Sequence, residues 1–139
     1  MLVEDIDFRL KDATAYQIGW KSLACGLSDI ASMGGVAKYA VISLGLPRRL
    51  SVEFVDELYR RIKALARKFD VEIVGGDTNS SKALVMDVAV LGFVEPEKLK
   101  LRSSAKPGDI ICVTGSLGGS YKSKRHLTFT PRLKEARCL

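Results

Sequence analysis

Two aspartates stand where a carboxylate could take part in chemistry, and Asp29 is the first. It is one of only two charged residues between Ile18 and Met33, where apolar residues recur at helical spacing. A helix that is apolar nearly all round is expected to be buried on more than one side, so its carboxylate needs a partner. A pair with Lys21 or a local backbone bond is the more common explanation, and metal or phosphate chemistry is the alternative.

Asp77 is the second candidate, because it follows Gly75-Gly76 after a β-branched run and precedes a series of hydroxyl and amide side chains, Thr78, Asn79, Ser80 and Ser81. The pattern predicts a glycine turn over residues 75–79. Backbone N–H groups and hydroxyls in such a turn can face an anion, and the carboxylate can hold a hard cation against phosphate. An ordinary Asp/Asn turn is the alternative, and for this motif alone it is the simpler one.

The sequence lacks the motifs and residues that several other kinds of active site require. The sequence has neither the G-x-x-x-x-G-K-[ST] motif of P-loop enzymes nor the G-x-G-x-x-G motif of dinucleotide folds. His126 is the only histidine and lies in a basic, irregular stretch, so a Ser-His-Asp triad or a histidine-rich metal site is not expected.

The composition limits the classes of partner and the cellular location that we expect. Of the net charge of +6 over 139 residues, +5 comes from residues 121–139, where six basic side chains face Glu135 alone. A charged tail of this kind does not predict a nucleic-acid interface. No apolar run approaches the ~20 residues of a membrane helix, and the start lacks the plan of a secretory signal. Three cysteines, Cys25, Cys112 and Cys138, show no paired spacing, so we expect a reducing cytoplasm, with Cys25 and Cys112 as core side chains.

The elements that must position the two aspartates follow from periodicity and capping. A capping box at Thr14 and Gln17 opens a first helix that Gly34-Gly35 ends, and Ser51 can cap a second helix. Strands are predicted over residues 2–8, 38–45, 71–75 and 83–94. The order β-α-β-α-β-β predicts an α/β (α+β) sandwich with helices on one face of the sheet.

The domain boundaries follow from composition. Residues 1–95 form the predicted N-terminal, ATP-binding-type domain, and residues 96–108 are polar, contain two prolines and form a predicted linker. Residues 109–114 (DIICVT) predict a further buried strand, after which regular patterning fails. We therefore expect residues 109–139 to be an incomplete start of a second α/β domain.

The chain resembles thiamine-monophosphate kinase, a family of the superfamily that includes aminoimidazole ribonucleotide synthetase and selenophosphate synthetase. Its signature pieces are LSDIASMGG and GGDT, and the other matching segments are MLVEDIDF, KYAVISLGLP, SSAKPGDIICVTGSLGGS and HLTFTPRLKEA. These segments span most of residues 1–120 in the family's order, and HLTFTPRLKEA resembles a family segment from further along the second domain.

The resemblance implies transfer of the ATP γ-phosphoryl group to thiamine monophosphate, which gives thiamine diphosphate. It implies Mg²⁺ held by Asp29 and Asp77, and a nucleotide beside Gly75, Gly76 and Thr78. Phosphoryl transfer needs positioning and charge neutralisation more than a strong nucleophile. The family also pairs its first domains into a homodimer, which implies buried surfaces on the first helix and on residues 83–94.

The chain departs from the family pattern in three places. The acidic G-D-D motif and the aspartate that the family has before the position of Met1 are absent, and the family's V-H-F is here Ile6-Asp7-Phe8. After Ser120 the chain passes directly to HLTFTPRL, so we expect a chain truncated at both ends. Two alternatives follow: a non-catalytic, dimer-forming fragment, or a superfamily member with a different acceptor. Neither a nucleic acid nor a membrane is an expected partner.

Overall fold

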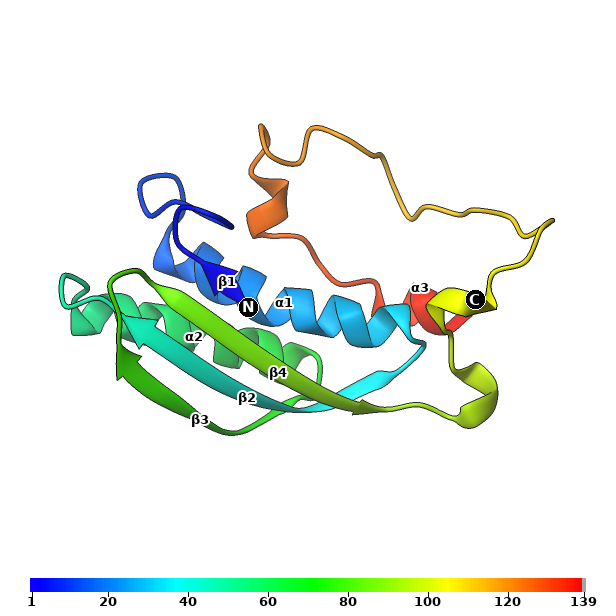
Figure 1. Ribbon diagram of the computed structural model, residues 1–139, viewed down its shortest axis with the longest axis horizontal. Coiled ribbons are helices and arrows are strands. Elements are labelled where there is room, and N and C mark those ends of the chain that lie inside the picture. Colours follow the sequence, from blue (N-terminus) through cyan, green and yellow to red (C-terminus); the bar gives the residue numbers. More distant parts are fainter. Residues whose placement is uncertain (139) are drawn as a thin grey trace.

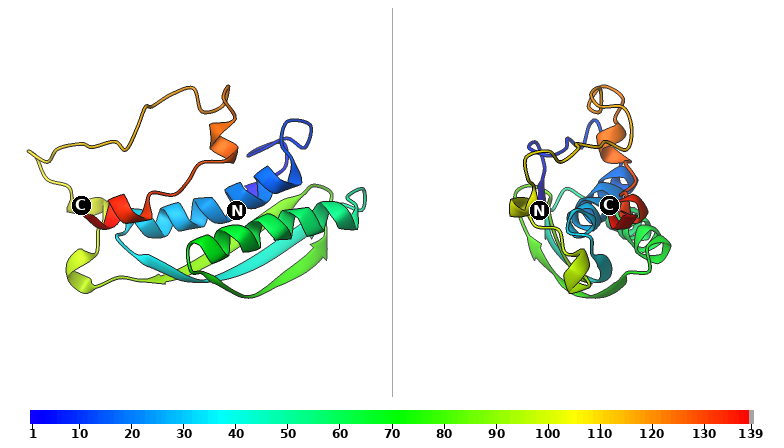
Figure 2. Two further views of the ribbon diagram at one scale, coloured as in Figure 1. Left: turned by 180° about the vertical axis from the view of Figure 1, so that it is seen from behind. Right: turned by 90° about the vertical axis from the view of Figure 1, so that its right-hand side faces the viewer.

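Two helices cover one face of a four-stranded sheet in the computed structural model, which describes residues 1–138 (Figure 1). Helix α1 spans Ala15–Ser32 and α2 spans Val52–Lys68. The strands are β1 (Leu2–Val3), β2 (Val36–Leu46), β3 (Glu72–Ser80) and β4 (Val85–Phe93). The end-on view in Figure 2 shows both helices on the same side of the sheet, as predicted.

The strands are arranged in the order β1-β4-β2-β3, with β2 parallel to β3 and antiparallel to β4. Alternate β2 residues such as Ile42 and Leu44 are buried beneath the helices, while Ser43 between them is exposed. Since side chains alternate across a strand, the sheet has a helix-covered face and an open face. Large apolar side chains lie exposed on the open face, among them Tyr39, Leu91 and Phe93.

The ends of both helices confirm the capping predictions. Thr14 and Gln17 form a complete capping box, and the Ser51 side chain accepts a hydrogen bond from the backbone of Phe54. Helix α1 stops at Ser32, and Gly34 follows with φ +74°. A side chain at Gly34 would meet the Lys98 carbonyl oxygen at 2.5 Å, so glycine is required there both for its conformation and for space.

Three predicted elements differ from the structure. The strand over residues 2–8 is confined to Leu2–Val3, because Asp5 adopts φ +65° and turns the chain. Residues 75–79 continue β3 instead of turning, since they pair in parallel register with β2. Residues 109–114 form no strand, and Ile110, Ile111 and Cys112 are exposed, so the prediction that Cys112 is a core residue is wrong.

The segment after residue 120, which showed no regular pattern in the sequence, packs along the outer side of α1 (Figure 1). It contains a short 3-10 helix at Arg125–Leu127 and the helix α3 at Leu133–Cys138. Leu127 is 2% exposed, and Phe129 and Leu133 contact the core cluster beside it. Burial of α1 on a second side therefore comes from this segment. Within residues 1–138, no helix combines the length and apolar character that crossing a bilayer requires.

Candidate functional site

Strand β3 places Asp77 in a row of polar side chains across the open face of the sheet. Ser43 of β2 lies opposite Asp77 on one side and opposite Asp87 of β4 on the other, and all three residues are exposed. Neighbouring strands lie about 5 Å apart, so the two carboxylates are separated by roughly 10 Å. They are too far apart to share one metal ion directly.

The Asp77 carboxylate is oriented by its own neighbours. One oxygen accepts a 2.8 Å hydrogen bond from the backbone N–H of Thr78, and the other accepts a 2.7 Å bond from the Asn79 side-chain amide. Each carboxylate oxygen can still accept a second bond. Asp77 can therefore supply one ligand to a cation or one acceptor to a polar molecule on this face.

The two glycines before Asp77 have different surroundings. A Cβ on Gly76 would lie 1.9 Å from the Ile42 carbonyl oxygen, whereas a Cβ on Gly75 would meet nothing within 4 Å. Gly76 therefore allows β3 to approach β2 closely, and Gly75 leaves open space at the surface. On the helix-covered face, burial raises the pKa of the Tyr59 phenol of α2, and Thr78 acts on this pKa in the opposite direction.

Asp29 is exposed, which contradicts the prediction that its carboxylate is buried. Helical spacing places Lys21, Cys25 and Asp29 in one row along α1. Burial raises the pKa of the Cys25 thiol; Lys21 lowers it, and Asp29 and Asp7 raise it. The Lys21 ammonium donates to the carbonyl oxygen of Asp7 at 2.6 Å rather than to Asp29. The predicted Lys21–Asp29 pair is therefore not formed.

The structure does not bring the two predicted metal ligands together. Asp29 belongs to the helical layer, and Asp77 lies on the face of the sheet that the helices leave open. No group of three or more His, Cys, Asp or Glu side chains within residues 1–138 is arranged to hold a metal ion. Magnesium commonly uses one or two protein carboxylates, with water and substrate phosphates completing its shell. Asp77 fits that role as a single ligand.

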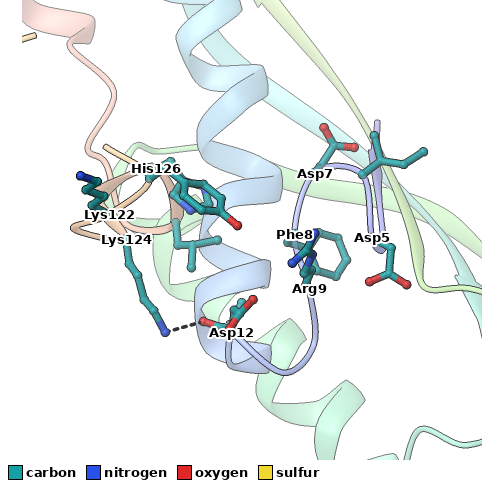
Figure 3. A pocket seen from close by; sticks show the side chains of 12 residues that line it. Asp5, Asp7, Phe8, Arg9, Asp12, Lys122, Lys124 and His126 are labelled. Atoms are coloured by element: carbon teal, nitrogen blue, oxygen red, sulfur yellow. Dashed lines mark hydrogen bonds between the residues drawn. The ribbon is translucent and has the colours of Figure 1, made fainter. Parts of the chain in front are cut away.

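A cavity of about 340 Å³ lies between the loop after β1 and the segment near His126 (Figure 3). Its loop side carries three aspartates and one arginine, and its other side carries Lys122 and Lys124; the loop residues are Asp5, Asp7, Arg9 and Asp12. The two sides are joined by a 2.8 Å hydrogen bond from Lys124 Nζ to the Asp12 carbonyl oxygen. A lining with both charge signs suits a small molecule that carries both a cationic and an anionic group.

Comparison with known proteins agrees with this architecture. Residues 1–94 match the family described as "AIR synthase related protein, N-terminal domain". The chain belongs to the AIR synthase related family. Matches to individual members of the family extend through the rest of the chain, including the segment that packs on α1.

Among its relatives, the thiamine-monophosphate kinase of Bacillus subtilis is 39% identical over 120 residues, which are 86% of this chain and 37% of the relative. That of Rhodopirellula baltica is 38% identical over 136 residues, 97% of this chain and 42% of the relative. A solved structure described as AaThiL complexed with AMPPCP and TMP superposes with a TM-score of 0.85 at 27% identity, covering 99% of this chain and 50% of that one. The chain thus spans half or less of the length of these relatives.

Sequence reasoning named Asp77 but missed the residues that share its face. Strand alternation, read together with the pairing of β2 with both β3 and β4, would have found Ser43 and Asp87. It also missed Lys122 and Lys124, because no local pattern connects the segment after residue 120 with the loop after β1. Only the packing of that segment on α1 brings these residues together.

Proposed function

We propose that this chain is the nucleotide-binding part of a Mg-ATP-dependent kinase that phosphorylates thiamine monophosphate to thiamine diphosphate. The observation that carries the proposal is the match of nearly the whole chain to thiamine-monophosphate kinases and to a solved relative described as holding AMPPCP and TMP. The free state of Cys25, Cys112 and Cys138 supports a reducing, cytoplasmic location.

The nucleotide is assigned to the open face of the sheet at the end of β3. Gly75 leaves space there, and Gly76 keeps the backbone close to β2. Thr78 follows Asp77, whose carboxylate would hold Mg²⁺ against the phosphates. The metal would neutralise charge that develops on the transferred group. Asp29 is assigned as a second metal ligand that has to be brought to Asp77 by further polypeptide.

A second copy of the chain is assigned to the open face of the sheet, as a homodimer partner. Tyr39 is 39% exposed, Leu91 55% and Phe93 65%, and they lie close together on β2 and β4. Tyr39 and Phe93 contact each other edge to face at 6.5 Å between ring centroids. Exposed apolar surface of this kind supports an interface between copies.

The acceptor is assigned to the cavity in Figure 3. Thiamine monophosphate carries a cationic ring and a phosphate. Asp5 and Asp7 would attract the ring, and Lys122 and Lys124 would attract the phosphate. By the resemblance, Asp7 occupies the position of the histidine in the family's V-H-F segment, so a carboxylate would face the acceptor where a ring is expected.

Calorimetric titration with AMPPCP and Mg²⁺ tests the nucleotide assignment. Asp77→Asn is expected to weaken binding at least about tenfold, since an ionic ligand contributes about 1.5–3 kcal/mol. Asp87→Asn is the matched control, because Asp87 lies in the same row as Asp77, two strands away, and its substitution removes the same charge. Equal affinity for all three proteins would refute the assignment, and a coupled assay for thiamine diphosphate tests turnover.

The alternative function is a non-catalytic unit that forms dimers. Two observations favour it: the exposed apolar face, and the absence within residues 1–138 of a carboxylate cluster that could hold a metal. Sedimentation without nucleotide would then show a dimer that Leu91→Asp dissociates, together with no binding of AMPPCP. A superfamily member with another acceptor would bind AMPPCP but form no thiamine diphosphate.

A further inference from the structure

A second, larger cavity of about 800 Å³ lies between α1 and the segment from residue 114 to residue 132. Among the described residues that line it there are three cationic side chains and no carboxylate: Lys21, Arg125 and Arg132. Five hydroxyl side chains also line it, from Thr114, Ser116, Ser120, Thr128 and Thr130. Such a lining offers many hydrogen-bond donors and an excess of positive charge, although Arg132 is paired with Glu135 outside the lining.

Each cationic side chain donates a hydrogen bond to a neighbouring group and has further N–H groups available. Lys21 uses one of its three N–H groups on the Asp7 carbonyl oxygen, at 2.6 Å. Arg125 donates through Nη2 to the carbonyl oxygens of Ser116 and Gly118, at 3.2 and 2.9 Å, which leaves its Nε and Nη1 groups available. Arg132 donates to Glu135 through Nη1 alone. The three side chains are therefore positioned without being saturated.

The glycine-rich loop on one side of the cavity adds backbone donors. Within residues 1–138, the N–H groups of Gly115–Gly119 donate to no other protein group. Gly118 and Gly119 adopt φ values of +84° and +66°, which other residues rarely take up. Free N–H groups in a glycine loop are a common means of binding oxyanions.

This environment affects the pKa of His126, which also lines the cavity. Its pKa lies below the usual value, first because burial disfavours the charged ring and then because Lys21 repels a further positive charge. The smaller contribution, from Lys21, agrees with an excess of positive charge around the cavity. An anion that enters it would relieve this repulsion.

We propose that this cavity binds a small phosphate-bearing anion, with Lys21, Arg125 and Arg132 surrounding the phosphate. Phosphate matches the available chemistry, because arginine forks, an ammonium group and hydroxyls together can saturate its oxygens. The site is separate from Asp77, since the segment forming it lies on the outer side of α1 and Asp77 lies on the open face of the sheet (Figure 1). It does not depend on phosphoryl transfer.

The test is a titration of the 139-residue chain with inorganic phosphate, AMP or thiamine monophosphate in separate arms. Heteronuclear NMR follows the loop amides, and calorimetry measures affinity. The amides of Gly115–Gly119 are expected to shift and saturate, and Arg132→Gln to weaken binding about tenfold. Lys63→Gln is the matched control, an exposed lysine of α2 that does not line the cavity. Lys21→Gln provides a second variant from a different element.

The arms distinguish the sources of the phosphate group. Comparable binding of all three anions assigns the site to free phosphate, and binding of the esters alone assigns it to a phosphorylated organic molecule; both support the proposal. Unmoved loop amides, or equal weakening by Lys63→Gln and Arg132→Gln, would overturn it. So would single-stranded RNA that binds the loop more tightly than any small anion. Asp77→Asn is expected to leave phosphate binding here unchanged, which separates this result from failure of the proposed function.

Discussion

The indole nitrogen of Trp20 donates a 2.6 Å hydrogen bond to the carbonyl oxygen of Phe129, 109 residues further along the chain. Leu127 lies two residues before this contact and is buried. Further along, Arg137 donates to the Gly34 carbonyl oxygen at 3.1 Å and pairs with Glu95 at 2.7 Å. The segment after residue 120 is therefore joined to both ends of α1, and it forms part of the same folded unit.

Truncation of Leu127 tests this conclusion. Leu127→Ala is expected to lower the free energy of unfolding by about 2–5 kcal/mol, because it leaves a cavity in a packed site. Leu117→Ala, at a position that is 81% exposed, is the control and should change it by less than about 0.5 kcal/mol. Urea denaturation followed by tryptophan fluorescence measures both. Equal, small effects would mean that the segment does not contribute to the core.

The two neighbouring glycines of β3 give a paired prediction. Gly76→Ala is expected to lower the free energy of unfolding by more than about 2 kcal/mol, since the added carbon would meet the Ile42 carbonyl oxygen at 1.9 Å and push β3 away from β2. Gly75→Ala adds the same atom into open space and should be neutral or slightly stabilising. Thermal unfolding of the two variants compares them directly, and similar melting temperatures would contradict the observed register.

Glu4 makes the stability of the fold depend on pH in the acidic range. It is 9% exposed, and burial raises its pKa, but hydrogen bonds from the Leu84 backbone and from Arg49 outweigh this effect and lower the pKa below 4.5. A carboxylate whose pKa falls on folding stabilises the folded protein at pH values above the pKa that the group has in the unfolded chain. This contribution is lost as the pH falls through the pKa of the folded state.

Glu4→Gln should therefore be less stable than the parent at neutral pH and should lose less stability on acidification. Urea midpoints measured above and below pH 4.5 test this. Asp56→Asn, an exposed change on α2, is the control and should follow the parent. A parallel pH profile for Glu4→Gln and the parent would show that Glu4 carries no such linkage.

His126 gives a second pH prediction that can be read from one signal, because the chain has a single histidine. Its pKa is expected below 6.5, owing to burial and then to the charge of Lys21. Since the unfolded chain binds the proton more readily, stability falls as the pH drops through 6.5. Proton NMR of the imidazole measures the pKa, and Lys21→Gln should raise it. A pKa at or above the usual value would contradict the burial of the ring.

Much of the layered architecture could be predicted from local patterns. The capping box at Thr14 and Gln17, the stop at Gly34 and the cap at Ser51 are decided by residues a few positions apart, and the structure contains all three. The order of the elements, β-α-β-α-β-β, predicted that the helices lie on one face of the sheet. The GGDT and LSDIASMGG segments also indicated the family, and the match of residues 1–94 to the AIR synthase related family confirms it.

The tertiary structure alone decided which surfaces face solvent and which residues meet. Asp29 looked buried because its helix is apolar, yet burial comes from the segment after residue 120, which leaves Asp29 exposed. Residues 75–79 look like a turn, yet pairing with β2 extends them into a strand. Ile110 and Ile111 look like a buried strand but find no partner within residues 1–138. The physical reason is common to all three: burial and strand pairing depend on long-range contacts, which local spacing does not contain.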